Sequence, residues 1–494
     1  MNRQIARLAL VGVGLVTALI VATTYWQTWA NAGLADRQDN EIQRVAQFSI
    51  KRGLIRAADG TILASNRIKR VDGQKLYFRR YPQGGLFAQV VGYSTQSRSR
   101  SGLESSLNDY LTGSNANLST ILDRTLDRIR GATIKGNNVW LTLQPAAQRV
   151  AMQQLQGKCG SVVALDPRTG KVLVMASRPT YDPNLVESDF GRINNIRAAC
   201  RPAAPLLNRA TDGLFVPGSI FKVVTSAAAL DSGRYTINST FVDRGYCIEY
   251  GKRVNNFADQ SGPEVFGTVN FLQALEHSIN AVFCEIRKAI GAGRILGTSK
   301  QFGFYKDPPL ETPANERAPS GLYDHGKLFY PSDPATQVDP GRLAFGQERM
   351  LTTPLEMAIV AAAVGNKGVI MEPHVVDRVT APGGGIVTRT RARKYRRAMK
   401  TSTAAELVRM MEAVVTGGTG TAAQIPGVRV AGKTGTAETG GALNTTWFIS
   451  FAPAGAPRVA IAVALQDQTG AGGTTAAPIA KAVMQAILSG RSNP

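Results

Sequence analysis

Residues 216–230 read VPGSIFKVVTSAAAL, and this stretch decides the fold and the chemistry predicted for the chain. The Pro-Gly pair before Ser219 interrupts the preceding structure, and the mostly apolar run behind it predicts a buried helix over 219–230. Ser219 therefore falls in the first helical turn, where unpaired backbone N–H groups and the helix dipole favour developing negative charge. Lys222 follows three residues later and shares that helix face.

The pairing of Ser219 with Lys222 has the composition of an activated nucleophile. A serine hydroxyl is a poor nucleophile unless a neighbouring base takes its proton. Burial disfavours the charged form of a lysine, so Lys222 is expected to lose its proton and to act as that base. Taken alone, the same pair also fits a helix N-cap serine beside a surface lysine.

A second short motif, Ser278-Ile-Asn280, follows further along the chain. Residues two apart do not share a helix face, so both side chains enter one cleft only from a turn between 271–277 and the helical 281–290. We expect Ser278 to relay a proton to a leaving amine and Asn280 to hold a substrate amide. The alternative is an ordinary helix cap, for which serine and asparagine are both favoured.

A third motif, Lys433-Thr434-Gly435-Thr436, is predicted at the end of a strand. Gly435 lacks a side chain, so a substrate backbone can lie against the strand edge. Lys433 supplies positive charge, and the Thr434 and Thr436 hydroxyls are expected to bind a terminal carboxylate. The backbone N–H groups of Ser219 and Thr436 would form an oxyanion hole. The alternative is a bulge at Gly435 beside a solvated lysine.

The order of the motifs is more specific than any one of them. S-x-x-K occurs once in the chain and K-T-G once, whereas S-x-N also occurs upstream at Ser106 and Asn108. All three motifs in this order are the parts that hold a serine ester against a substrate carrying a carboxylate. The three histidines form no cluster and the cysteines lack metal-site spacing, so we expect no metal and no cofactor. Disulfides are compatible with the sequence, but their pairing is not predicted.

The N-terminus predicts a membrane anchor at residues 8–30. No charged residue stands between Arg7 and Asp36, and the apolar stretch has the length that a membrane helix needs. Basic residues before it favour an N-terminus inside and a catalytic body outside. The competing interpretation is a signal peptide cleaved at the A-x-A site of residues 30–32.

Composition predicts a large core and a basic surface. The chain has 494 residues, 44% of them hydrophobic, and a formal net charge of +22. No nucleic-acid-binding motif accompanies the charge, so anionic lipid headgroups are the better partners for an anchored protein. The one dense basic run, at residues 389–400, also fits a solvated surface segment.

Four segments are expected. Residues 40–130 are polar, charged and irregular, whereas the strand-like 138–143 and 160–176 and the helical 402–415 and 476–488 predict a mixed α/β body with an antiparallel sheet flanked by helices. The predicted boundaries are a cytoplasmic tail at 1–7, the anchor at 8–30, an elongated pedestal or dimerisation-type domain at 31–150, and the catalytic domain at 151–494.

The chain resembles the monofunctional, class B penicillin-binding proteins, and among them the actinobacterial penicillin-binding protein A group, over essentially its whole length. It departs from the commoner pattern at Arg56-Ala-Ala58, which concerns the pedestal and not the chemistry. Besides the three motifs, the segments that carry the resemblance are Arg52-Gly53 with Asp59–Ala64, Gly102-Leu-Glu104 with Leu111-Thr-Gly113, Phe345-Gly-Gln347 with Thr353-Pro354, and Gly417–Gly420.

The resemblance implies the penicillin-recognising serine transpeptidase fold and a D,D-transpeptidase that cross-links peptidoglycan stem peptides in cell-shape or cell-division synthesis. Ser219 would attack the penultimate D-alanine carbonyl, expel the last D-alanine, and pass the acyl group to an amine of a neighbouring stem. β-Lactams would acylate Ser219 as substrate mimics. Such proteins work with a membrane-embedded glycosyltransferase and other wall-synthesis proteins, close to pyrophosphate-bearing precursors.

Two alternatives remain open at this point. One is a hydrolase, either a D,D-carboxypeptidase or a β-lactamase, in which water replaces the amine. A class A β-lactamase needs a glutamate to activate that water in an E-x-x-L-N motif, and Glu311-Thr-Pro-Ala-Asn315 partly matches this motif in a proline-rich loop. A non-enzymatic β-lactam sensor or scaffold is disfavoured by the intact Ser219, Lys222 and Lys433.

Overall fold

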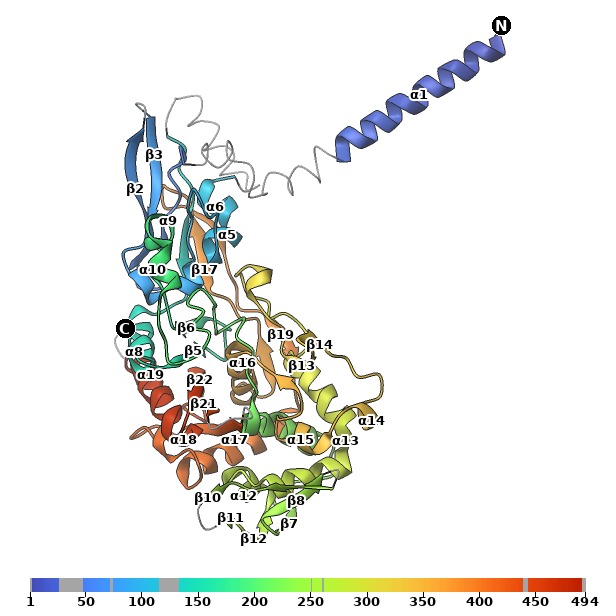
Figure 1. Ribbon diagram of the computed structural model, residues 1–494, viewed down its shortest axis with the longest axis vertical. Helices are drawn as coiled ribbons and strands as arrows, with labels where there is room; N and C mark the ends of the chain where they lie inside the picture. The colour runs from blue at the N-terminus through green and yellow to red at the C-terminus, as the bar shows by residue number, and fades with distance from the viewer. Residues whose placement is uncertain are drawn as a thin grey trace.

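The computed structural model describes residues 2–25, 48–71, 74–114, 133–249, 251–259, 262–438 and 443–490. One of its two main sheets, which we call the catalytic sheet, has five strands and is antiparallel throughout (Figure 1). Its strands, in spatial order, are β20 (Ala431–Glu438), β21 (Asn444–Ala452), β22 (Val459–Gln468), β5 (Cys159–Leu165) and β6 (Val172–Arg178).

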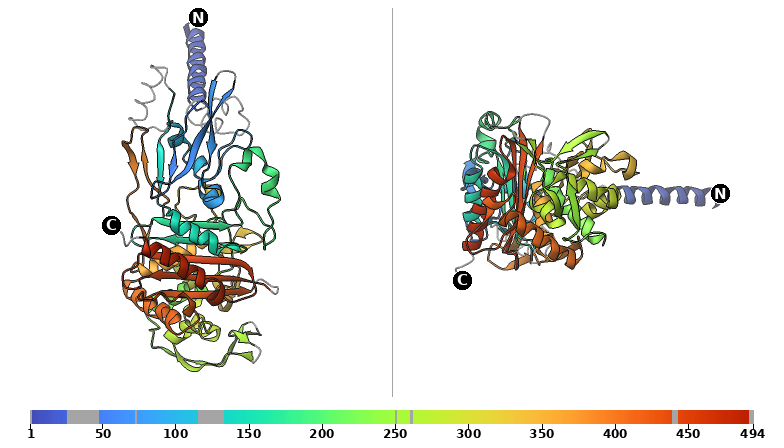
Figure 2. Two further views of the ribbon diagram at one scale, coloured as in Figure 1. Left: turned by 90° about the vertical axis from the view of Figure 1, so that its left-hand side faces the viewer. Right: turned by 90° about the horizontal axis from the view of Figure 1, so that it is seen from below.

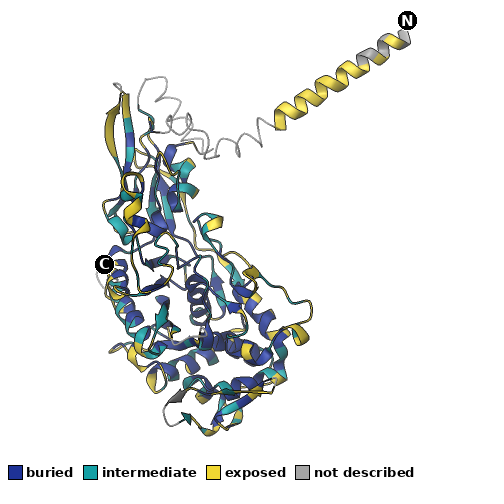
Figure 3. Cartoon of the chain, viewed as in Figure 1, coloured by how far each residue is buried: buried dark blue, intermediate teal, exposed yellow. Residues whose placement is uncertain are grey.

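Helices cover both faces of this sheet because its strands are apolar on both faces. Along β22, Val459, Ile461 and Val463 lie in the core beneath α8 (Pro145–Gln154) and α19 (Ala477–Ser489). The alternating alanines of β22, at 460, 462 and 464, face the opposite core, where α16 (Pro354–Gly365) packs closely on the strand. The sheet lies between these layers (Figure 2), and the buried residues continue through all of them (Figure 3). The predicted mixed α/β fold is confirmed.

The remaining helices of the catalytic body gather on the α16 side of the sheet. The long α13 bends at Gly291, which has φ +73°. These helices are α11 (Lys222–Asp231), α12 (Phe271–Glu276), α13 (Asn280–Phe302), α14 (Pro334–Gln337), α15 (Pro340–Ala344) and α17 (Thr401–Thr416). The other short elements of this body are the 3-10 turns η3 (Gly218–Phe221) and η4 (Ala314–Glu316), and α18 (Gly472–Thr475) and η5 (Thr421–Ala423), both of which contact α19.

Small antiparallel ribbons complete this body. Residues 240–270 form what we call the ribbon lobe, at the end of the molecule away from the pedestal (Figure 1). The lobe holds β7 (Thr240–Asp243) paired with β12 (Gly267–Asn270), β8 (Tyr246–Glu249) with β9 (Lys252–Asn255), and β10 (Ala258–Asp259) with β11 (Gly262–Pro263); elsewhere β13 (Gly321–Asp324) pairs with β14 (Lys327–Leu328) and β15 (Met350–Leu351), and β16 (Val369–Met371) with β19 (Lys394–Arg397).

A second main sheet, of six strands, forms the pedestal. Its strands, in spatial order, are β18 (Ile386–Arg389), β17 (Val376–Thr380), β4 (Asn138–Leu141), β1 (Ile55–Arg56), β2 (Ile62–Val71) and β3 (Gln74–Arg80), and nearby lie η2 (Gly84–Leu86), α4 (Ala88–Val91), α5 (Gly102–Ser106), α6 (Asn108–Thr112), α9 (Leu185–Ser188) and α10 (Phe190–Asn194).

Two expectations for this region need revision. The described part of 40–130 is not irregular throughout, since β2 and β3 pair over a long antiparallel ribbon. The outer half of this ribbon is exposed on both faces and so lacks the hydrophobic alternation that marks a strand. The predicted boundary at residue 150 is also crossed in space. The strands β17 and β18 join the pedestal sheet, while α8 packs on the catalytic sheet.

A buried ion cluster joins the two segments that were matched to the pedestal of the family. The Arg52 guanidinium donates to Glu104 Oε2 at 2.9 and 3.2 Å, and Arg79 Nε donates to Glu104 Oε1 at 2.6 Å. Burial raises the pKa of the Glu104 carboxyl, but Arg79 and Arg52 outweigh it and hold that pKa below its usual value. The Arg52-Gly53 and Gly102-Leu-Glu104 segments are therefore partners in one electrostatic contact.

We expect Glu104→Gln to lower the free energy of unfolding by about 3–5 kcal/mol at neutral pH, because it leaves two guanidinium groups buried without a counter-charge. The pKa of Glu104 is lower in the folded state than its ordinary value of 4.5. The stability that its carboxylate contributes is therefore present above pH 4.5 and is lost as the pH falls through the folded-state pKa. Chemical denaturation at several pH values measures both effects. Glu412→Gln, in the exposed bidentate pair with Arg429, is the matched control and should cost under about 1 kcal/mol. Equal losses in the two variants would contradict the assignment.

Glu356, in the first turn of α16, is a second buried carboxyl, and it has no ion-pair partner among the described residues. Its Oε1 atom lacks a hydrogen-bond partner in the described part of the chain. Burial raises the pKa of Glu356 to about 8, and Arg396 opposes this only in part. The folded protein therefore holds Glu356 in its neutral form at neutral pH.

The free energy of unfolding should consequently fall as pH rises from 4.5, the ordinary glutamate value, towards about 8, because the folded state binds a proton there that the unfolded state releases. The decline attributable to Glu356 is at most about 5 kcal/mol. Glu356→Gln should flatten this part of the profile, as measured by guanidinium unfolding at each pH. An unchanged slope in the variant would show that other groups produce it.

The helix α1 (Asn2–Tyr25) covers most of the expected anchor. Its residues 10–25 are exposed (Figure 3), among them the apolar Leu10, Val13 and Leu19. Within the described residues, no helix reaches both the length and the hydropathy required for a membrane crossing. Residues 26–30 of the predicted anchor, and the A-x-A site at 30–32, lie outside the described residues.

Candidate active site

The turn that carries Ser219 is held against the edge of the catalytic sheet. Ser219 lies in the 3-10 turn η3 and is partly exposed, while Ile220 and Phe221 beside it are fully buried. Gly218 has φ +55°, and a Cβ atom there would lie 3.0 Å from the Cβ of Ala437 in β20. A glycine is therefore required before Ser219, and the predicted helix begins with a tighter turn than an α-helix.

Lys222 begins α11 and is fully buried. Its Nζ donates to Ser278 O at 2.6 Å, to Asn280 Oδ1 at 2.7 Å and to Ser278 Oγ at 3.2 Å. The Nζ atom also lies 5.1 Å from the centre of the Phe283 ring. Burial, and then the neighbouring charge of Lys433, lower the pKa of Lys222 well below its ordinary value. Among the described residues no hydrogen bond joins Ser219 Oγ to Lys222.

Ser278 lies on the predicted turn, and Asn280 lies where that turn enters the helix. Ser278 has φ +60° between α12 and α13, and its N–H donates to Leu275 O at 3.2 Å. Asn280 is the first residue of α13. The left-handed conformation at Ser278 turns the chain so that both side chains meet the same lysine, which residues two apart on one helix cannot do.

Lys433 approaches Ser278 from the opposite side. Its Nζ donates to Ser278 Oγ at 2.9 Å and to Thr434 O at 3.0 Å, and the side chain is fully buried. Burial lowers the pKa of Lys433 to about 7. The hydroxyl of Ser278 thus lies between two lysine nitrogens, one from each of the other motifs.

The K-T-G-T motif lies within β20 and not at a strand end, so that expectation was wrong. The strand continues to Glu438 because Thr434, Gly435 and Thr436 all pair with β21. β20 is nevertheless the edge strand of the sheet. An edge strand leaves backbone N–H and C=O groups for another extended chain.

Gly435 has a structural role that the sequence did not predict. A Cβ atom at this position would lie 3.0 Å from both Ile220 Cγ2 and Pro217 O. The absent side chain therefore lets β20 pack against the Ser219 turn. Trp447, opposite Gly435 on β21, reinforces the contact because its Nε1 donates to Val216 O at 2.9 Å.

Other residues of the site were not identified from the sequence. Thr419 Oγ1 lies 2.6 Å from Thr434 Oγ1, and the Gly472 N–H donates to Thr436 Oγ1 at 3.2 Å. The Gly346 carbonyl accepts from the Gly218 N–H at 3.1 Å. Thr419 and Gly346 lie within segments 417–420 and 345–347, and the resemblance of these segments to the family could have identified them. No feature of the sequence pointed to Gly472.

Glu311 does not belong to this site. Its carboxylate accepts from the backbone N–H groups of Val375 and Val376 at 2.9 and 3.2 Å, at the start of β17. It lines a separate cavity of about 400 Å³ with Pro309, His374 and Arg391, none of which belongs to the three motifs. Burial raises the pKa of Glu311. Its role is to hold the strand that leads into the pedestal.

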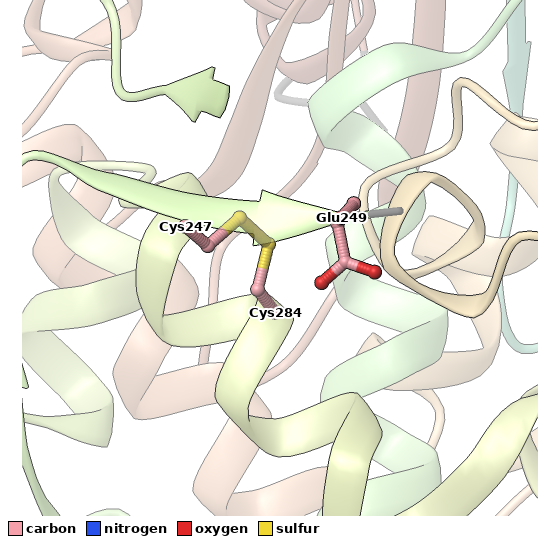
Figure 4. Close-up of side chains that lie close together, drawn as sticks. All are labelled: Cys247, Glu249 and Cys284. Atoms are coloured by element: carbon pink, nitrogen blue, oxygen red, sulfur yellow. A yellow bond between two sulfur atoms is a disulfide. The ribbon is translucent and has the colours of Figure 1, made fainter. Parts of the chain in front are cut away.

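All four cysteines are paired. Cys159 bonds to Cys200, and Cys247 bonds to Cys284. Glu249 lies beside the second disulfide, and the three residues together have the composition of a metal site (Figure 4). The two sulfurs are bonded to each other, and Glu249 is paired with Arg287 at 2.5 Å, so this cluster is a covalent and ionic tether.

Comparisons with known proteins agree with this architecture. The penicillin binding protein transpeptidase domain family matches residues 160–485, and the penicillin binding protein A dimerisation domain family matches residues 52–139. The peptidoglycan D,D-transpeptidase PbpA of Mycolicibacterium smegmatis is 34% identical over 511 aligned residues, which cover 99% of each chain.

Solved structures of penicillin-binding protein A from Mycobacterium tuberculosis are also similar. Its imipenem acyl-enzyme complex has a TM-score of 0.79 at 32% identity and covers 90% of this chain and 100% of that chain. Its penicillin G acyl-enzyme complex has a TM-score of 0.77 at 32% identity and covers 89% of this chain and 100% of that chain. With both domain families in order and a third of its residues shared along its whole length, this chain belongs to the class B penicillin-binding proteins.

Proposed function

We propose that this protein is a serine D,D-transpeptidase that cross-links peptidoglycan stem peptides through an acyl-enzyme at Ser219. The observation that carries the proposal is the convergence of three separate motifs on one hydroxyl. Ser278 Oγ accepts from Lys222 at 3.2 Å and from Lys433 at 2.9 Å, and Lys222 directly follows the turn that holds Ser219.

Acylation begins with transfer of the Ser219 hydroxyl proton to Lys222. Burial and the charge of Lys433 lower the pKa of Lys222, which favours the neutral amine that a general base requires. Ser219 Oγ then bonds to the penultimate D-alanine carbonyl carbon, and the backbone N–H groups of Ser219 and Thr436 are proposed to stabilise the resulting oxyanion.

Collapse of this intermediate breaks the peptide bond to the last D-alanine. The leaving nitrogen takes a proton from Ser278, and Lys222 returns its own proton to Ser278. The hydrogen bond between Lys222 Nζ and Ser278 Oγ supports this relay. An amine of a second stem then attacks the ester and releases Ser219 with its proton, so the cycle needs no metal or cofactor.

The carboxylate of the substrate is assigned to Lys433 and the hydroxyls of Thr434 and Thr436. These groups line the edge strand β20, where the stem peptide would extend the sheet. Asn280 is assigned to the substrate amide. β-Lactams carry an equivalent carboxylate and a strained amide, and the relatives described above form acyl-enzymes with imipenem and penicillin G.

The protein is a cell-wall enzyme, and its membrane attachment and partners are part of the proposal. The exposed apolar side chains of α1 and the charge-free stretch after Arg7 support an anchor at residues 8–30 with the body outside the cytoplasmic membrane. A membrane-embedded glycosyltransferase is the expected partner, because a cross-linking enzyme needs newly made glycan strands.

Ser219→Ala should abolish covalent labelling by benzylpenicillin, because it removes the only atom proposed to form the ester. Intact-mass spectrometry of the full-length protein, followed over hours, should show a long-lived adduct on the wild type alone. Glu311→Gln is the control and should keep the adduct and its lifetime. An adduct that disappears from the wild type within seconds would instead support a hydrolase, and no adduct on either protein would support a scaffold.

The second-order rate of acylation should have a bell-shaped pH dependence. Lys222 must be neutral, so the rate falls as pH drops through its depressed pKa. Lys433 must be charged to bind the carboxylate, so in the free enzyme the rate also falls as pH rises through about 7. Lys433→Gln should lower the rate and remove the alkaline limb, as measured by stopped-flow labelling with a fluorescent penicillin. An alkaline limb that persists in the variant would assign it to another group.

A further inference from the structure

The ribbon lobe is tethered along one face of α13, the helix that begins with Asn280. Asn280 Nδ2 donates to Asn255 O at 2.8 Å, Cys284 forms a disulfide with Cys247, and Arg287 pairs with Glu249. Positions 280, 284 and 287 have the spacing of a single helix face. The tethers come from β8 and β9, so this hairpin lies along the first turns of α13.

The first tether continues into a buried polar network. Asn256 Oδ1 accepts from the backbone N–H of Ala281 at 3.1 Å, and Asn256 Nδ2 donates to both carboxylate oxygens of Asp243 at 3.0 Å. Asp243 also accepts from the N–H groups of Gly245 and Phe266, both at 2.9 Å. Asp243 and Asn256 are 2% and 4% exposed. A fully satisfied buried network of this kind fixes its members in one arrangement.

The network lies next to Asn280, whose amide can bond to both of its partners in only one orientation. An amide presents one acceptor and one donor group, and only one orientation of Asn280 suits both of its partners. Its Oδ1 must face the donor Lys222 Nζ, at 2.7 Å, while its Nδ2 faces the acceptor Asn255 O. Asn256 accepts a hydrogen bond from the backbone N–H of Ala281, the residue that follows Asn280 in α13. The network thus holds the backbone on both sides of the contact between Asn280 and Asn255 O, since Asn256 follows Asn255 in the chain and bonds to the residue after Asn280.

We propose that Asn256 and Asp243 are positioning residues for the acylation reaction, which orient Asn280 and through it Lys222 and Ser278. This inference rests on the proposed function, since it assigns support to residues of that site. Neither residue touches Ser219 or the K-T-G-T strand in the described part of the chain. Both act through the first turn of α13.

Loss of the contact between Asn280 and Lys222 should change the pKa of Lys222 in a definite direction. Lys433 is the charged side chain that faces Lys222 from β20, and Ser278, Asn280 and Phe283 are its other neighbours. An acceptor favours the ammonium form of a lysine, so loss of the Asn280 Oδ1 contact lowers the pKa of Lys222 further. The acid limb of the acylation profile then moves to lower pH even though the maximal rate falls.

The test compares Asn256→Ala and the near-isosteric Asp243→Asn with wild type. Full-length protein in detergent is labelled with a fluorescent penicillin between about pH 5 and 9, and the melting temperature is measured in parallel. Both variants should lose roughly tenfold or more in the second-order acylation rate, and their acid limb should move to lower pH. Asp243→Asn keeps the shape of the network, so it gives a result even if Asn256→Ala does not fold.

Glu249→Gln is the matched control, because it alters another tether of the same lobe to the same helix without contacting Asn280. It should lower the melting temperature and leave the pH profile of the remaining activity in place. The inference is overturned if the Asn256 and Asp243 variants behave like this control, or like wild type. Ser219→Ala separates this from failure of the proposed function: labelling that survives in Ser219→Ala, or is absent from wild type, rejects the function itself.

Discussion

Two buried lysine side chains share the hydroxyl of Ser278, and the rest of the site is arranged around this contact. Within the described residues no carboxylate pairs with either lysine, so burial and mutual repulsion both act against two full charges. Burial lowers the pKa of both lysines, and the charge of Lys433 lowers the pKa of Lys222 further. This asymmetry favours a neutral base at Lys222 beside a cation at Lys433.

Burying two lysine side chains without a carboxylate costs free energy, and the close packing around them keeps the surrounding elements from moving apart. Unpaired buried ammonium groups would draw in water or separate if the surrounding elements moved apart. The Ser219 turn is therefore held by closely approaching backbones: Gly218 and Gly435 leave no space for a side chain between η3 and β20. Trp447 adds a hydrogen bond from the next strand. The two alanine-rich and aliphatic cores of the sheet supply the apolar burial that offsets the polar cost.

The sequence predicted the parts of this arrangement that are local. Ser219 with Lys222, and Ser278 with Asn280, depend on spacing along a helix or turn, which short-range geometry determines. The strand-like character of the apolar residues 160–176 was equally clear, whereas the exposed strands β2 and β3 were missed because they lack hydrophobic alternation. Contacts between distant segments could not be predicted from the sequence. They include the contact of Arg52 with Glu104, the cysteine pairing, and the contact of Asn256 with the start of α13. Each joins polar residues whose sequence neighbours carry no sign of the partner.

The same long-range connectivity links the site to the pedestal. The chain passes between the two sheets from β4 to α8, returns from β16 to β17, and leaves again from β18 to β19. A single linker would let the domains rotate, but repeated crossings restrict that rotation, and Glu311 adds hydrogen bonds at one of them. The residues that enter the pedestal sheet as β17 follow α16 and β16, which pack on the catalytic body. Displacement of the pedestal would therefore act on the layer that supports the catalytic sheet, and the distance between the pedestal sheet and Ser219 is constrained by the fold itself.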